Sequence, residues 1–137
     1  MAGKFRVELV TPEGVVLDKE VEEIVAPGIQ GEFGVLVGHT PMLTFLKPGI
    51  FSYLENNSFT RFAVGPGFCE VLGDSVTALV DQAYGIEQVD GAVVASELAE
   101  LEKQLMSIDP TADPDAYERV STKIKIARAM VALAAGK

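Results

Sequence analysis

Hydrophobic and polar residues alternate in short runs through residues 1–86 and follow a helical period after them. In "KFRVELV", for example, Phe5, Val7 and Leu9 alternate with charged residues, which places the apolar side chains on one face of a strand. Further runs of this kind follow, separated by turn residues, and no helical crossover lies between them. The pattern therefore predicts an N-terminal antiparallel β-sandwich or barrel over residues 1–86.

Turn residues predict how some of these strands are connected. Asn56-Asn57 and Gly73-Asp74 each separate two predicted strands, and both pairs tolerate the positive φ that two-residue hairpin loops require. Thr40-Pro41 suits a short helical turn, and Pro48-Gly49 suits the start of the next hairpin. We expect residues 31–49 to form an exposed, rigid surface loop.

Apolar residues recur at helical spacing from residue 87 onward. Asp90 is a candidate N-cap for a first amphipathic helix, whose apolar stripe is Val94, Leu98, Leu101, Leu105 and Ile108. Two prolines then interrupt the pattern, and Asp113-Pro114 supplies a second N-cap followed by proline at the first helical position. The stripe of this second helix is Tyr117, Val120, Ile124, Ala127 and Val131. The two helices predict a C-terminal antiparallel two-helix hairpin over residues 87–137.

The second predicted helix carries a second apolar row, Ile126, Met130 and Leu133, which the hairpin seam does not fully cover. A helix with two apolar sides needs two neighbours. The helix is also basic, with five bases against two acids over residues 114–137, whereas residues 90–109 carry five acids against one base. Charge pairing within the hairpin explains this contrast, and so does an acidic docking site on another protein.

Composition limits the classes of function. The chain of 137 residues is 48% hydrophobic and has neither a long apolar run nor a secretion signal, so we expect it to be soluble and not exported. Its net charge of −9 argues against a nucleic-acid partner, because phosphate contacts depend on Lys and Arg, and favours a protein partner. One cysteine and one histidine cannot form a disulfide framework or the usual zinc site, and Cys69 is expected to be a small buried strand residue.

The segment "GEFGVLVGHTPMLTFLKPG" contains the only candidate for catalysis, His39. A general base would need an orienting acid and a nucleophile, and only Thr40 and Thr44 lie beside it in the sequence. The glycines before it lack the G-K-[ST] of a phosphate-binding loop and precede a predicted strand. The sequence therefore predicts no enzyme, no metal site and no cofactor.

Two segments resemble signatures of a known family. "PGIQGEFGVLVGHTPMLTFLKPG", residues 27–49, resembles the pattern P-G-x-x-G-[ED]-[FLM]-G-[IV]-L-x-x-H-[AT]-P of the epsilon subunit of bacterial and chloroplast F-type ATP synthases. "GPGFCEVLGDSVTALVDQA", residues 65–83, resembles the second block of that family, with Pro66 as the one departure. The resemblance covers essentially the whole chain and implies a sandwich of about ten strands followed by two helices.

The resemblance also implies partners and a role. It assigns Gly31, Glu32, Gly38 and His39 to docking on the gamma subunit and the ring of membrane c subunits, as part of a non-catalytic rotor subunit. The second helix would reach acidic segments of the alpha and beta subunits and inhibit ATP hydrolysis when extended, through Arg119, Lys123, Lys125, Arg128, Ile126, Met130 and Leu133. The protein would lie at the cytoplasmic side of a bacterial inner membrane, which it meets only through the complex.

Some members of this family bind ATP at the hairpin through an [IL]-D-x-x-R-A motif and two further arginines. Here the corresponding stretch is "VDGAVVA", in which Asp90 is present but Val93 stands where the arginine would be. Arg128 matches one of the other arginines, and Ile124 occupies the second position. A phosphate chain would lose its bidentate partners, so we expect no ATP binding.

Two alternatives share part of this evidence. A free-standing β-sandwich that binds sugars or peptides would carry exposed aromatic residues, and the chain has no Trp and three Tyr. An unrelated adaptor that docks a protein through its helix hairpin would share the architecture but not the two signatures.

Overall fold

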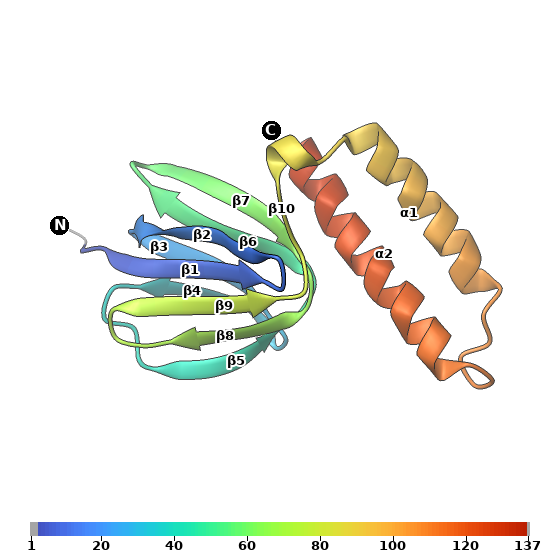
Figure 1. Cartoon of the computed structure of the whole chain (residues 1–137), viewed down its shortest axis with the longest axis horizontal. Coiled ribbons are helices and arrows are strands. Elements are labelled where there is room, and N and C mark those ends of the chain that lie inside the picture. Colours follow the sequence, from blue (N-terminus) through green and yellow to red (C-terminus); the bar gives the residue numbers. More distant parts are fainter. Residues whose placement is uncertain (1–2, 137) are drawn as a thin grey trace.

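The computed structural model describes residues 3–136, which form ten β-strands followed by a short 3-10 helix and two α-helices (Figure 1). The strands are β1 (Phe5–Thr11), β2 (Gly14–Val21), β3 (Glu23–Gly28), β4 (Gly31–Leu36), β5 (Met42–Leu46), β6 (Gly49–Glu55), β7 (Ser58–Val64), β8 (Gly67–Val71), β9 (Ser75–Val80) and β10 (Ala83–Gly85). The helices are η1 (Ile86–Gln88), α1 (Gly91–Met106) and α2 (Pro114–Ala135). The predicted fold class, a β-sandwich followed by a two-helix hairpin, is confirmed. The division into domains at residues 86 and 87 stays a prediction.

The ten strands form one sheet that folds over on itself into two layers. Its order is β10-β7-β6-β3-β5-β8-β9-β1-β2, and β4 pairs with β3. The sheet turns between β3 and β5, where the register pairs only Gly28 with Leu46. On the opposite side of the sandwich, an ion pair joins the two layers: the Lys19 ammonium on β2 lies 3.0 Å from the Glu55 carboxylate on β6. Side chains from both layers, including Phe51 and Leu9, fill the buried core between them.

One strand pair departs from the antiparallel prediction. β1 and β9 run parallel, from Arg6 opposite Ser75 to Val10 opposite Leu79. The prediction was wrong for this pair because it considered only connections between consecutive strands. Parallel neighbours need a long connection, and the whole of β2 to β8 supplies it.

The helices begin where the sequence predicts. The Asp90 carboxylate accepts hydrogen bonds from the backbone N–H groups of Ala92 and Val93, and Asp113 caps α2 ahead of Pro114. Only the end of the first stripe differs, since Ile108 lies two residues beyond the end of α1. No helix in residues 3–136 is both long enough and apolar enough to cross a membrane.

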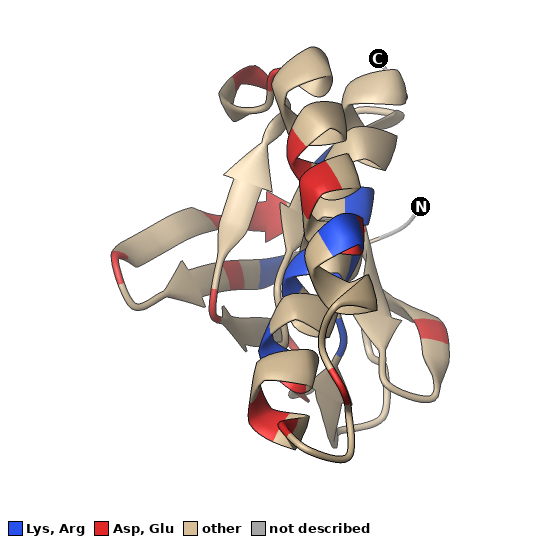
Figure 2. Ribbon diagram, turned by 90° about the vertical axis from the view of Figure 1, so that its right-hand side faces the viewer, with Lys and Arg blue, Asp and Glu red and all other residues tan. Residues whose placement is uncertain are grey.

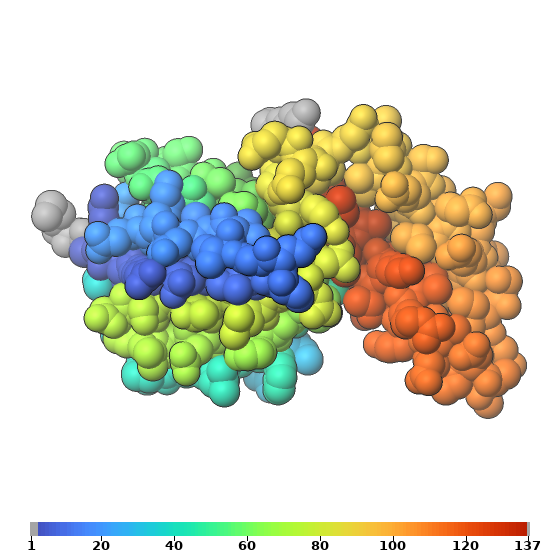
Figure 3. Space-filling model, viewed as in Figure 1, coloured from blue at the N-terminus to red at the C-terminus, as the bar shows by residue number. Residues whose placement is uncertain are grey.

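α2 lies between α1 and the outer face of β6 and β7 (Figures 1 and 3). A second buried cluster, separate from the core of the sandwich, contains Ala63 of β7, Leu133 of α2 and Val94 of α1. The sandwich therefore has its own core, and the hairpin is held on its outside by a second one.

The turns follow the sequence in part. Asn56 and Asn57 have φ of 52° and 62° and connect β6 to β7, as predicted. Gly73-Asp74 also form a two-residue connection, closed by a hydrogen bond from the Leu72 N–H to the Ser75 carbonyl, but neither residue has a positive φ. The predicted helical turn at Thr40-Pro41 is wrong, because these residues are irregular.

Candidate functional surfaces

The four predicted rotor-docking residues lie at the two ends of β4 and not on one loop. Gly31 and Glu32 begin the strand, whereas Gly38 and His39 follow its end. A strand rises about 3.3 Å per residue, so β4 holds the two pairs well apart. The expectation that residues 31–49 form one surface loop is wrong: glycines and prolines mark the ends of β4 and β5, and the strands themselves are alternately buried and exposed.

The two ends of β4 have different neighbours. The Gly38 N–H donates a hydrogen bond of 3.4 Å to the Gly73 carbonyl, which places this end beside the β8–β9 turn and away from the helices (Figure 1). Glu32 instead lines a groove of about 490 Å³ together with Arg61 of β7 and the last turn of α2, from Ala132 to Gly136. Both glycines have positive φ, 136° at Gly31 and 80° at Gly38, which a larger residue would resist.

His39 has no catalytic arrangement around it. Its Nδ1 lies 2.6 Å from the backbone carbonyl of Thr40, so this nitrogen is the donor and the ring is held against its own loop. No cluster of His, Cys, Asp or Glu in residues 3–136 could hold a metal ion. The geometry around His39 therefore suits a surface contact.

An exposed apolar band crosses the outer face of the layer formed by β5, β8, β9, β1 and β2. We define this band as Phe45, Phe68, Leu79, Val10 and Val15. Consecutive members are directly opposite one another on β5, β8, β9, β1 and β2. Phe45 is 66% exposed, Phe68 40%, Leu79 38% and Val15 61%, whereas Val10 is half-buried. A contiguous exposed apolar patch of this kind is a candidate interaction site.

Sequence reasoning missed the apolar band because its members lie on five strands whose neighbours were unknown. One local signal was present. In β5, "MLTFL", Leu43 and Phe45 lie on one face and Leu46 on the other, so the strand is apolar on both faces. An apolar pattern on both faces is typical of a strand that has a second neighbour besides its own core.

The second apolar row of α2 is covered in this structure. Ile126 is 5% exposed and Leu133 3%, while Met130 is half-buried. The two neighbours that the row requires are α1 and the sandwich. The hairpin alone does not cover the row, as predicted, but the outer face of β6 and β7 does, so the row is not free for another partner in this docked state. The sequence could not show that this face of β6 and β7 is available for packing.

The bases of α2 remain exposed. Arg119, Lys123 and Lys125 lie on the surface of the hairpin, where Figure 2 shows basic and acidic residues side by side. Arg128 lies 3.3 Å from Glu102 of α1, an exposed ion pair. Among the described residues, this is the only ion pair between the two helices, so charge pairing within the hairpin explains a small part of the basic charge.

The residues considered for ATP do not come together. Asp90 uses its carboxylate to cap α1, whereas Arg128 lies beside Glu102, twelve positions further along α1. At about 1.5 Å per residue, this is roughly 18 Å along the helix.

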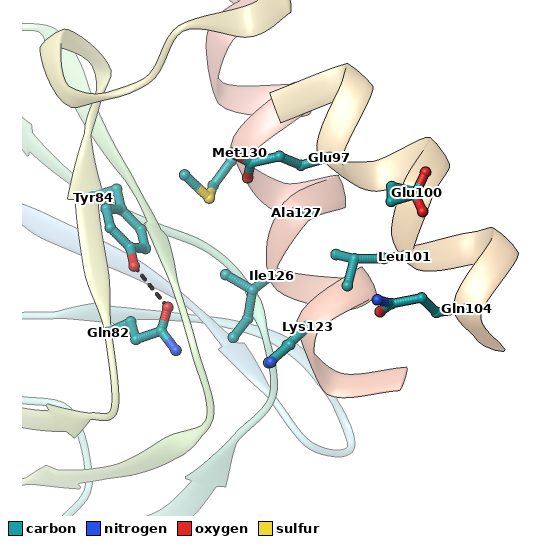
Figure 4. A pocket seen from close by; sticks show the side chains of 10 residues that line it. All are labelled: Gln82, Tyr84, Glu97, Glu100, Leu101, Gln104, Lys123, Ile126, Ala127 and Met130. Carbon is teal, nitrogen blue, oxygen red and sulfur yellow. Dashed lines mark hydrogen bonds between the residues drawn. The ribbon is translucent and has the colours of Figure 1, made fainter. Parts of the chain in front are cut away.

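A pocket of about 420 Å³ lies between β10, α1 and α2 (Figure 4). Its apolar floor includes Leu101, Ile126 and Met130. Its rim carries the carboxylates of Glu97 and Glu100 against the single base Lys123. A rim with more acids than bases opposes a phosphate chain.

Comparison with known proteins defines the class of this fold. The family model described as "ATP synthase, Delta/Epsilon chain, beta-sandwich domain" matches residues 4–86, which span the ten strands. The fold is also that of solved structures. A chain in the Euglena gracilis mitochondrial ATP synthase, OSCP/F1/c-ring, superposes with a TM-score of 0.81 at 23% identity, covering 94% of this chain and 80% of that one. A chain in the Tetrahymena thermophila mitochondrial ATP synthase, central stalk/c-ring, superposes with a TM-score of 0.61 at 14% identity, covering 95% of this chain and 98% of that one.

Relatives in sequence define the family more narrowly. The "ATP synthase epsilon chain 2" of Syntrophotalea carbinolica is 41% identical over an alignment 133 residues long, which covers 93% of this chain and 96% of that protein. The epsilon chain of Geotalea daltonii is 44% identical over 110 residues, 80% of each chain. The chain therefore belongs to the ATP synthase epsilon chains, which are non-catalytic subunits. This excludes an unrelated sandwich module or adaptor.

Proposed function

We propose that this chain is a rotor subunit of an ATP synthase, which joins the gamma subunit to the c-ring through its sandwich and restrains ATP hydrolysis through its hairpin. Membership of the epsilon chains supports the assignment to the complex. The observation that carries the rotor role is the exposed apolar band, because a surface of this kind is normally covered by a partner. The structural neighbours come from c-ring and central stalk assemblies.

The sandwich offers two surfaces to the rotor. The apolar band is suited to a long contact with gamma, since it crosses five strands and its aromatic residues give buried area at low entropic cost. The end of β4 with Gly38 and His39 lies away from the helices and is suited to the c-ring. Glu32, at the other end of β4 and beside the last turn of α2, supplies a charge that can set the fit of a separate contact with the rotor.

The hairpin is the regulatory part of the proposal. The structure has it docked on the sandwich, with Ile126 and Leu133 buried and the bases of α2 exposed. Extended along the stalk, α2 would bring Arg119, Lys123, Lys125 and Arg128 to acidic segments of the alpha and beta subunits and resist hydrolysis. Such an exchange needs two states within a few kcal/mol of each other. A hairpin with its own cluster outside the sandwich core supports this.

The position in the cell follows from the complex. We place the protein at the cytoplasmic side of a bacterial inner membrane, in contact with the membrane only through its partner subunits. The proposal includes no nucleic-acid partner and no bound nucleotide, consistent with the net charge of −9 and the acidic rim of the pocket between β10, α1 and α2.

Co-purification tests the rotor role. Phe45→Ser and Phe68→Ser should each weaken binding to the gamma subunit by about tenfold, because each removes an aromatic side chain from the apolar band. Val93→Ser is the control, since Val93 is 51% exposed but lies on α1, outside the sandwich. If the band variants bind gamma as tightly as the control does, the band is not the gamma interface.

A further inference from the structure

Gly65 lies between β7 and β8, and its backbone conformation does not require a glycine. It has no positive φ, and its N–H donates a hydrogen bond of 2.9 Å to the Gln82 carbonyl, which any residue except proline could make. The reason for glycine must therefore lie in the space that a side chain would fill. A Cβ at this position would lie 3.3 Å from Cδ1 of Ile126 on α2.

The other contacts of this missing side chain are ordinary. A Cβ would lie 3.5 Å from the Gln82 nitrogen and 3.7 Å from the Asp81 Cβ. Gly67, two residues on, is different, since a Cβ there would collide with the backbone of Leu79 and Val80 inside the sandwich. Of these two glycines, Gly67 is required by the sandwich itself, whereas the tight contact at Gly65 is made with the hairpin.

Ile126 makes a contact with the sandwich that lies outside the second buried cluster. It projects from α2 toward the sandwich (Figure 4) and lines both the pocket of about 420 Å³ on its α1 side and a second cleft of about 520 Å³ beside Pro66 and Asp81. The N-terminal half of α2 is separated from the sandwich (Figure 3). Leu133, two turns further on, packs in the second cluster with Ala63. The docked hairpin is therefore held mainly by the second cluster around Leu133, and the separate contact at Gly65 has no spare room.

We propose that Gly65 is a steric gate for the docked hairpin: a branched side chain at this position displaces Ile126 and releases α2 from the sandwich. A methyl group can be accommodated, because Cδ1 is the flexible end of the isoleucine and needs to move by only a few tenths of an ångström. The two further methyls of valine have no such space and overpack the contact. The consequence for ATP hydrolysis rests on the proposed function.

Hydrogen exchange of the full-length isolated chain tests the gate. In Gly65→Val, the amides of α2 should exchange at least about tenfold faster than in the native chain, because a modest overpacking cost changes an equilibrium by about this factor. The amides of β8 and β9 should stay protected. Gly65→Ala should lie close to the native chain. Gly73→Val is the matched control, because Gly73 has no positive φ and a Cβ there would meet nothing within 4 Å. The control should leave α2 protected.

A compensating substitution makes the test specific. Ile126→Ala shortens the residue that Gly65→Val displaces, so the double variant should recover most of the protection lost in Gly65→Val. If Gly65→Val leaves α2 exchange unchanged, or if Ile126→Ala gives no recovery, the gate is wrong. If Gly65→Val unfolds the sandwich, Ile126→Trp presses on the same contact from the helix side, and unchanged α2 exchange in that variant also overturns the proposal.

The gate and the proposed function fail separately. Gly65→Val in the reconstituted synthase should lower ATP hydrolysis, because it favours the extended hairpin. Faster α2 exchange without any change in hydrolysis would leave the gate standing and contradict the regulatory role of the hairpin.

Discussion

At the scale of single residues, burial decides what the Cys69 thiol can do, and helix capping occupies the Asp90 carboxylate. Cys69 is fully buried in β8, as expected of a small strand residue. Asp90 was expected to cap a helix and does so. Both results follow from local pattern. Phe45 and Phe68 could not be recognised as one surface, because they lie on strands that are neighbours in the fold but far apart in the sequence.

The Cys69 thiol should be unreactive in the folded chain. Burial raises its pKa from 9.0 to about 12, so the reactive thiolate is scarce below that pH. A raised folded pKa means that the thiol favours folding below the unfolded pKa and that this contribution is lost as pH rises from about 9 toward 12. A colorimetric thiol reagent at pH 8 should label the unfolded chain at least about a hundredfold faster than the native one. Equal rates would show that β8 opens readily.

Glu32→Lys should weaken assembly with gamma and the c-ring by about tenfold, because it reverses a charge at the proposed interface. Glu32 is exposed, so the free energy of unfolding should change by no more than about 0.5 kcal/mol. Reconstitution with the partner subunits measures the first effect and urea unfolding the second. Glu13→Lys, in the exposed β1–β2 turn, is the control. Normal assembly of the Glu32 variant would remove Glu32 from the interface.

At the scale of elements, local signals predicted the helices better than the strand arrangement. Caps and a 3.6-residue period are properties of a continuous segment, and they placed α1 and α2 within a few residues. The parallel pairing of β1 with β9 and the cover that β6 and β7 give to α2 depend on non-local packing. The segment from 31 to 49 was misread for a related reason, since its glycines and prolines mark strand ends as well as loops.

The hairpin should not bind ATP at low micromolar concentrations, an affinity of about 8 kcal/mol. Val93 supplies no guanidinium at the start of α1, Arg128 is paired with Glu102, and the pocket beside α2 has an acidic rim. Isothermal titration calorimetry of the isolated chain with ATP and Mg²⁺ measures this directly. Saturable binding in that range would show that other residues hold the phosphates.

At the scale of the whole molecule, the two buried clusters predict which C-terminal truncations leave a folded sandwich. α1 packs on α2, so ending the chain after Ile108 would leave α1 without its partner. Ending it after Gln88 removes both helices and leaves the core between the two strand layers intact. We expect this shortened chain to fold and to join the rotor.

The shortened chain should relieve the restraint on ATP hydrolysis in the reconstituted complex. Hydrolysis assays at low and high salt compare it with the full chain. Alanine at Lys123, Lys125 and Arg128 should give part of the same effect, more visibly at low salt, where exposed charges are less screened. If hydrolysis is no faster without the helices under any of these conditions, the hairpin is a structural brace.

The parallel pairing of β1 with β9 also constrains the order in which the protein can fold during synthesis. β1 is made before the other strands of the sandwich, but its layer is completed only after β9 has emerged, because β9 pairs with β1 on one side and with β8 on the other. Contacts between segments so distant in sequence form slowly and leave apolar strand surface exposed to other chains meanwhile. The nascent β1–β2 hairpin must therefore wait for almost the whole sandwich, and chaperones have their longest opportunity to bind it during that interval.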